Sequence, residues 1–247
     1  MLVAVDGTGP WNDETYRREM SGSFVSKIYN LFHGSEKHYR RGPTLLGLET
    51  GPIANEYADV ILRQYKETKK NGGEFKLFLT GYSRGAASVI GVAYLLNNYE
   101  PEIKVDFMAL FDAVDRSPIM TADTIPSNVK MCYHAIRDQN AGSRTYFGNC
   151  GTTADHPAVM LKRTFFATHA GMGGIPWTGD HPKKVIANPT FNMSEYIQNN
   201  RFNMHDRSLP PEATIEVEMI TESQDRGGSS EVEKWMWEGM IKYGMLK

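Results

Sequence analysis

The residues with the clearest chemical meaning are Gly81–Gly85 (GYSRG), which form a G-x-S-x-G pentapeptide. The apolar run Phe75–Thr80 precedes them, and the small-residue run Gly85–Asn97 follows. The first run is typical of a buried strand and the second of a helix. A sharp turn between the two would hold the Ser83 hydroxyl exposed at its tip. We therefore predict that Ser83 is a nucleophile, because a serine that merely caps a helix does not need glycine on both sides.

A serine hydroxyl attacks well only when a base removes its proton, so a histidine must lie nearby in the fold. His169 follows the apolar run Arg163–Thr168, precedes the glycine-rich run Ala170–Gly174, and lies 86 residues after Ser83. This placement agrees with the chain order Ser, acid, His of α/β-hydrolases. We predict that His169 is the base. His134 falls within a predicted strand and is expected to be a core histidine.

The acid that orients the base should also follow a strand. Asp112 ends the apolar run Val105–Phe111, and Asp138 follows the run Val129–Ile136. Asp115 lies in the same turn as Asp112. Each of the three could reach the imidazole, and spacing alone leaves the choice open.

An acyl-transfer site also needs N–H donors for the oxyanion. The Arg84 N–H is expected at the start of the helix that follows Ser83. The loop Asp6–Gly9, which follows the predicted strand Met1–Val5, could supply a second donor from Gly7 or Thr8. This loop does not match the dinucleotide fingerprint G-x-G-x-x-G, because the last glycine is replaced by Asn12.

The elements that must position these residues alternate along the chain. Short apolar runs alternate with helical-period stretches, of which Ile53–Lys70 is the clearest, and this alternation is typical of an α/β fold. We predict one domain over residues 1–247, with a mostly parallel sheet, helices on both faces and the site at the carboxyl ends of the strands. Phe24–His33 is predicted as a short helix, and Thr44–Leu48 as a strand or loop.

The region near the carboxyl terminus has the pattern of an amphipathic helix. Val232, Trp235, Met236, Met240 and Ile241 recur at helical spacing. We expect this helix to pack against its own domain. The alternative is that it contacts a partner through Trp235 and Trp237, as part of a non-catalytic interaction module that keeps the fold.

Composition excludes several classes of protein. The chain has 27 Lys+Arg and 29 Asp+Glu, a formal charge of −2, without the basic surface of a dedicated nucleic-acid binder. No apolar run approaches the roughly 20 residues that span a bilayer, and no signal-peptide pattern is present. The two cysteines lack metal-ligand spacing. We predict a cytoplasmic protein, or one exported without a signal peptide, that needs no metal or organic cofactor.

Five segments in order resemble the bacterial α/β-hydrolase domain family typified by type VI secretion phospholipase effectors. They are VDGTGPWND, GYSRGA, LFDAVD, HAIRD and FFATHAGMGG, and they fall within roughly residues 1–175. The resemblance implies that Ser83 is the nucleophile, Asp112 the acid and His169 the base, which favours Asp112 over Asp138. The strand at Met1–Val5 implies an α/β-hydrolase-like sheet without the usual two leading antiparallel strands. One departure is Gly171, at the position where the family has an aspartate.

The resemblance also implies a function and partners. It implies an ester hydrolase, with a lipid or phospholipid among the substrates, and it implies contact with a membrane surface. A secretion partner or an immunity protein is implied as well. An apolar acyl chain needs a cover over the cleft, and we expect it from Ser117–Pro126 or from Gly171–Pro211, which contains Trp177.

Overall fold

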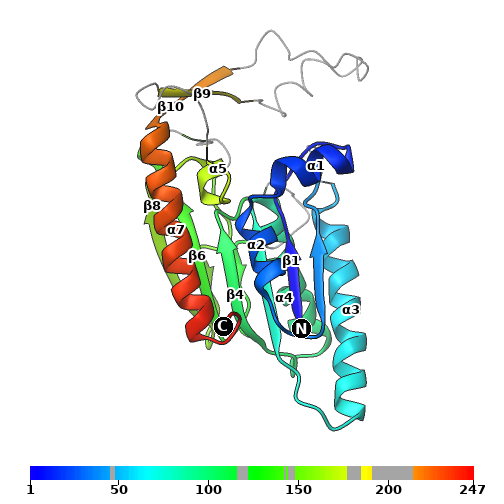
Figure 1. The fold of residues 1–247 in the computed structure, drawn as a ribbon. Coiled ribbons are helices and arrows are strands. Elements are labelled where there is room, and N and C mark those ends of the chain that lie inside the picture. The colour runs from blue at the N-terminus through cyan, green and yellow to red at the C-terminus, as the bar shows by residue number, and fades with distance from the viewer. Residues whose placement is uncertain (45–47, 116–121, 142, 144–147, 177–184, 191–213) are drawn as a thin grey trace.

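A six-stranded sheet in which every pairing is parallel forms the centre of the molecule, in a computed structural model (Figure 1). The structure describes residues 1–44, 48–115, 122–141, 143, 148–176, 185–190 and 214–247. In spatial order the strands are β2 (Lys37–Arg40), β1 (Leu2–Val5), β3 (Leu77–Tyr82), β4 (Val105–Phe111), β6 (Met131–Arg137) and β8 (Val159–Phe165). Within the described residues this sheet has no antiparallel strand.

Helices cover both faces of the sheet. The helices α3 (Thr50–Lys70) and α4 (Arg84–Tyr99) pack on one face, and α2 (Phe24–Leu31) and α7 (Glu222–Lys242) pack on the other. Because side chains alternate along a strand, Val3 and Val5 of β1 point into the first core and Leu2 and Ala4 into the second. The predicted α/β architecture is confirmed.

The helices that flank the sheet form where the sequence predicts them. Helix α3 places Ile53, Tyr57 and Ile61 in the core and ends before Gly72, whose φ of 70° suits glycine. Helix α4 buries ten of its sixteen residues, since it packs against α3, β1 and β3. Its alanines and glycines allow that close packing.

The carboxyl-terminal helix packs against its own sheet. Helix α7 begins with a capping box at Thr221. Its residues Val232, Met236 and Met240 are buried against the sheet. Trp235 stacks on Tyr133 with 4.7 Å between ring centroids, and Trp237 meets the ring of Phe24 edge-on at 5.7 Å. Both tryptophans therefore pack against the core of this face, and the helix packs against its own domain as predicted.

Several elements differ from the prediction. Helix α1 (Asp13–Met20) and strand β2 were not predicted, because both are polar and carry no clear apolar period. Thr44 lies in a loop, and residues 45–47 are outside the described part. The glycine-rich run after Thr168 begins as a helical turn, α5 (His169–Met172).

The remaining elements are short. They are β5 (Thr124–Ile125) paired with β7 (Thr153–Ala154), β9 (Val185–Thr190) paired with β10 (Thr214–Thr221), and the 3₁₀ turn η1 (Gln139–Ala141). Strand β9 lies within Gly171–Pro211, and β10 follows that stretch. Most of the two predicted covers, including Trp177, lies outside the described residues. None of the described helices combines the length and apolarity that a membrane crossing requires.

Candidate active site

Ser83 occupies the tight turn between β3 and α4. Its φ of 56° and ψ of −128° lie in a region that non-glycine residues rarely adopt, at a cost of about 1–3 kcal/mol. The Ser83 N–H donates to the carbonyl of Phe111 at 3.0 Å, which ties the turn to β4. A Cβ at Gly81 would lie 2.6 Å from Ala86 Cα, and one at Gly85 would lie 2.1 Å from the Asp6 carbonyl oxygen. The glycines on both sides are therefore required by close backbone packing.

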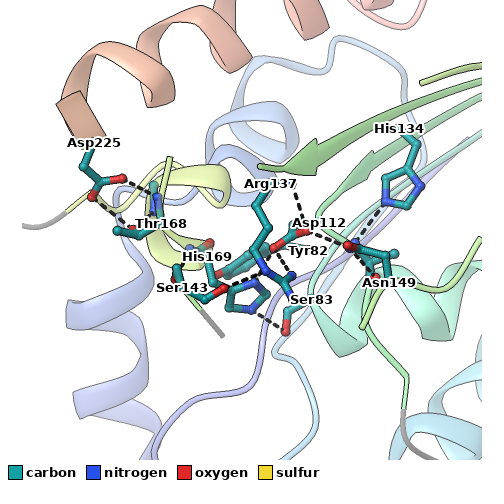
Figure 2. A network of polar contacts seen from close by, with 12 residues as sticks. Tyr82, Ser83, Asp112, His134, Arg137, Ser143, Asn149, Thr168, His169 and Asp225 are labelled. Carbon is teal, nitrogen blue, oxygen red and sulfur yellow. Dashed lines mark hydrogen bonds and ion pairs between the residues drawn. The ribbon is translucent and has the colours of Figure 1, made fainter. Parts of the chain in front are cut away.

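His169 links the serine to a carboxylate. Its Nε2 lies 3.0 Å from Ser83 Oγ, and its Nδ1 lies 2.6 Å from Asp112 Oδ2 (Figure 2). The main chain of His169 is held on both sides, because its N–H donates to Ser143 Oγ at 2.8 Å and its carbonyl accepts from the Tyr82 hydroxyl at 2.8 Å. The structure thus brings together the three residues predicted as nucleophile, base and acid.

Asp112 follows β4 and is fully buried. Arg137, at the end of β6, places Nη1 2.5 Å from Asp112 Oδ2, and Asn149 Nδ2 donates to Asp112 Oδ1 at 2.7 Å. Burial alone would raise the pKa of the Asp112 carboxyl, but Arg137, His169 and Asn149 outweigh it and hold the pKa below its ordinary value. Asp112 is therefore ionised at neutral pH. An ionised Asp112 favours a proton on His169 Nδ1 and leaves Nε2 as the acceptor for the serine proton.

The other candidate acids lie elsewhere. Asp138 Oδ1 accepts from the Asn140 N–H at 2.9 Å, so this carboxylate begins the turn η1. Asp115 lies three residues beyond Asp112, and the described hydrogen bond of His169 Nδ1 goes to Asp112. Sequence reasoning missed Arg137 and Asn149. For Arg137 a weak signal existed in the run HAIRD, where an arginine ends a buried strand.

Helix α7 anchors the turn that carries His169. The fully buried Asp225 accepts from the Thr168 N–H at 2.7 Å and from Thr168 Oγ1 at 3.0 Å (Figure 2). Thr168 in turn caps α5 by accepting from the Gly171 N–H at 2.9 Å. A Cβ at Gly171 would lie 2.2 Å from Asp225 Oδ1, so the Asp225 carboxylate fills the space that a side chain at position 171 would need.

The loop Asp6–Gly9 lies against the serine turn. A Cβ at Gly7 would lie 2.5 Å from the ring of Tyr82, and Thr8 Oγ1 is 3.5 Å from Arg84 Nη1. The Gly7 N–H donates to Asp6 Oδ1 at 2.8 Å, so this predicted oxyanion donor is already engaged. Arg84 is the first residue of α4, which places its N–H at the positive end of the helix dipole. Of the two predicted loop donors, Thr8 is therefore the one whose N–H is left as a candidate for binding the oxyanion.

His134 lies behind the acid and belongs to the core, as predicted. Its Nε2 accepts from the Ala113 N–H at 3.1 Å, and its Nδ1 faces the Gly151 carbonyl oxygen at 3.0 Å, which fixes a neutral ring. Burial lowers the pKa of His134 to about 4 and outweighs the Gly151 hydrogen bond and the Asp112 charge. This ring therefore holds the turn after Asp112 and stays neutral at physiological pH.

The low pKa of His134 predicts an acid-sensitive contribution to folding. In the unfolded chain histidine binds a proton below about pH 6.5, whereas folded His134 binds one only near pH 4. The free energy of unfolding should therefore fall by about 3 kcal/mol from this residue as the pH drops from about 6.5 to 4. Asp6, whose pKa burial raises to about 6, acts in the opposite direction.

The substitution His134→Gln isolates this contribution. At pH 7 the variant should be about 2 kcal/mol less stable than wild type, because one or both buried hydrogen bonds weaken. Urea denaturation at pH 7 and 4.5 should show that deficit vanish at the lower pH. A deficit that stays constant between the two pH values would contradict the buried, neutral state of His134.

Comparisons with known proteins identify no family for the chain. No family model and no curated protein matches its sequence. An uncharacterized protein from Pseudomonas aeruginosa has a TM-score of 0.46 and 14% identity, over 70% of this chain and 41% of that one. The RedJ thioesterase of the prodiginine pathway in Streptomyces coelicolor has a TM-score of 0.35 and 14% identity, over 70% and 84% of the two chains. Likenesses of this extent do not define an activity.

Proposed function

We propose that the chain is a serine hydrolase that cleaves carboxylic esters. The observation that carries this proposal is the continuous series of hydrogen bonds from Ser83 Oγ through His169 to Asp112. The strained turn at Ser83 supports it, since such strain commonly marks a functional residue. The buried ion pair with Arg137 supports it as well, because it keeps Asp112 ionised behind the imidazole.

In the first half of the proposed reaction, Ser83 Oγ attacks the ester carbonyl carbon. His169 Nε2 accepts the serine proton as the new C–O bond forms, and Asp112 stabilises the imidazolium. The N–H groups of Arg84 and Thr8 would receive the oxyanion of the tetrahedral intermediate. As that intermediate collapses, His169 returns the proton to the leaving alcohol and an acyl-serine remains.

In the second half, water replaces the alcohol. His169 takes a proton from the water as its oxygen attacks the acyl carbon. Collapse of the second intermediate releases the carboxylic acid and returns the proton to Ser83. Every proton transfer uses His169 Nε2, so this chemistry requires no metal or organic cofactor.

Lipid esters are the substrate class that the family resemblance supports. A lipase or phospholipase activity, contact with a membrane surface, and a secretion or immunity partner therefore belong to this proposal. The triad itself does not select the leaving group, so thioesters are expected to react by the same steps.

The proposal is tested by assaying purified wild type and Ser83→Ala side by side. The substrates are nitrophenyl acetate, butyrate and palmitate, an acyl thioester, and phospholipid vesicles. We expect hydrolysis of at least the short esters by wild type and only background rates with the variant. Equal rates for the two folded proteins on every substrate would contradict a serine hydrolase and favour a non-catalytic interaction module.

A further inference from the structure

The peptide between Gly7 and Thr8 is held from one side by a buried tyrosine of helix α1. The Tyr16 hydroxyl donates to the Gly7 carbonyl oxygen at 2.7 Å, and the same hydroxyl accepts from the Gly42 N–H at 2.9 Å. Tyr16 is 1% exposed, and α1 lies at the carboxyl end of the sheet, close to β1 (Figure 1). The hydroxyl therefore donates to one main-chain group and accepts from another, and the Tyr39 hydroxyl lies beside it.

The next peptide back, between Asp6 and Gly7, is held as well. Its N–H donates to Asp6 Oδ1 at 2.8 Å. The other carboxylate oxygen of Asp6 accepts from Ser23 Oγ at 2.5 Å and from the Tyr39 hydroxyl at 2.8 Å. Asp6 is fully buried, so its side chain has one fixed position. Both peptide planes that meet at Gly7 are thus fixed by buried side chains.

The geometry of the peptide bond fixes the direction in which the Thr8 N–H points. In a trans peptide the N–H points opposite to the C=O of the same plane. Since the Gly7 carbonyl points to Tyr16, the Thr8 N–H must point away from Tyr16. Within the described part of the chain, the Thr8 N–H has no hydrogen-bond acceptor.

The glycines around this loop bring its main chain close to Tyr16 and to Gly42. A Cβ at Gly42 would lie 2.1 Å from the Gly7 carbonyl oxygen, and one at Gly9 would lie 2.5 Å from the Tyr16 ring. The Arg41 guanidinium lies 4.5 Å from the centre of the Tyr16 ring. Burial also raises the pKa of the Tyr16 hydroxyl, so its proton stays available for the Gly7 carbonyl.

We propose that Tyr16 is a positioning residue that holds the Thr8 N–H toward the oxyanion formed at Ser83. The role rests on the proposed hydrolase function, because it matters only if an oxyanion forms. Without the Tyr16 hydroxyl the Gly7–Thr8 peptide can rotate, and the donor is then misplaced in the transition state. Substrate binding before reaction does not depend on that donor.

The first test is Tyr16→Phe, which keeps the ring and removes the hydroxyl. Loss of a whole oxyanion donor lowers kcat by about 10²–10³. A displaced donor should therefore lower kcat on nitrophenyl butyrate by roughly 10–100-fold, with KM within about threefold of wild type. The affinity for a trifluoromethyl ketone, whose adduct with serine carries an oxyanion, should fall by a similar factor.

Tyr57→Phe is the matched control. It removes a buried tyrosine hydroxyl from the core on the other face of the sheet, away from the Gly7–Thr8 peptide and from Asp6. We expect its kcat within about threefold of wild type. Rates are measured at a temperature at which circular dichroism shows every variant folded. A Tyr16→Phe protein that folds at no temperature would overturn the assignment, since the hydroxyl would then serve folding.

A double-mutant cycle shows whether Tyr16 acts through Thr8. Thr8→Pro removes the N–H itself, so adding Tyr16→Phe to that variant should change kcat by less than about threefold. Unchanged kcat in Tyr16→Phe alone, a change confined to KM, equal losses in Tyr57→Phe, or full additivity in the cycle would each overturn the proposal. If wild type hydrolyses no ester or thioester, the hydrolase function has failed rather than the role of Tyr16.

Discussion

Replacing Ser83 with alanine is expected to lower kcat by at least about 10⁴-fold on short nitrophenyl esters. The reason is that the three residues of a triad act as a unit, and only binding and the oxyanion donors remain when the nucleophile is lost. The fold should persist, because the hydroxyl contributes a hydrogen bond to His169 but no buried core contact. Initial rates and a thermal melt of the same preparation provide the measurement.

Ser83→Gly is the matched control for this variant. It should be equally inactive, yet more stable than Ser83→Ala by about 1 kcal/mol, because glycine adopts a φ of 56° without strain. Activity of either variant within tenfold of wild type would rule out Ser83 as the nucleophile. A Ser83→Gly protein less stable than Ser83→Ala would contradict the strained turn.

Replacing Asp112 with asparagine should affect activity and stability together. The kcat is expected to fall by about 10⁴, since a neutral amide no longer fixes the His169 tautomer or stabilises the imidazolium. The free energy of unfolding should fall by about 3–5 kcal/mol, because Arg137 is 4% exposed and would lose its buried ion pair with Asp112. Urea denaturation and steady-state kinetics measure the two effects.

A second substitution separates the two effects. Adding Arg137→Met to Asp112→Asn removes the buried charge as well and should restore most of the stability, but none of the activity. Lys130→Met is the control for an exposed pair, with Lys130 Nζ 2.6 Å from Asp106, and should cost less than about 1 kcal/mol. Recovery of activity together with stability in the double variant would show that Asp112 acts through folding and not on His169.

The fold was largely predictable from sequence because its core strands are continuous apolar runs. Val105–Phe111 is predicted and observed with the same bounds, and the elements around Ser83 differ by only a few residues. The turn at Ser83 was predictable because steric demands on glycine at positions 81 and 85 are local. Local patterns of this kind require no knowledge of distant contacts.

What the sequence did not reveal depends on contacts between distant segments. Spacing left Asp112, Asp115 and Asp138 equivalent; the family resemblance favoured Asp112, and the contact that selects it is the hydrogen bond to His169 Nδ1. Asp225 reaches Thr168 from a helix 57 residues away in the chain. Tyr16 lies in the short, polar helix α1, in which it and Met20 are the buried residues, so the sequence offers little apolar pattern from which to predict the helix. Partners of this kind come from the tertiary fold, which overrides local pattern.

The measurement that tests the central claim most directly is labelling of the folded wild type with a fluorophosphonate, followed by intact mass and peptide mapping. The phosphorus electrophile reports an activated serine without any assumption about the substrate. We expect one adduct per chain, located on Ser83, with labelling abolished in Ser83→Ala and slowed at least about 10²-fold in His169→Ala. No adduct on the folded wild type, or an adduct at another residue with Ser83 unmodified, would contradict the account.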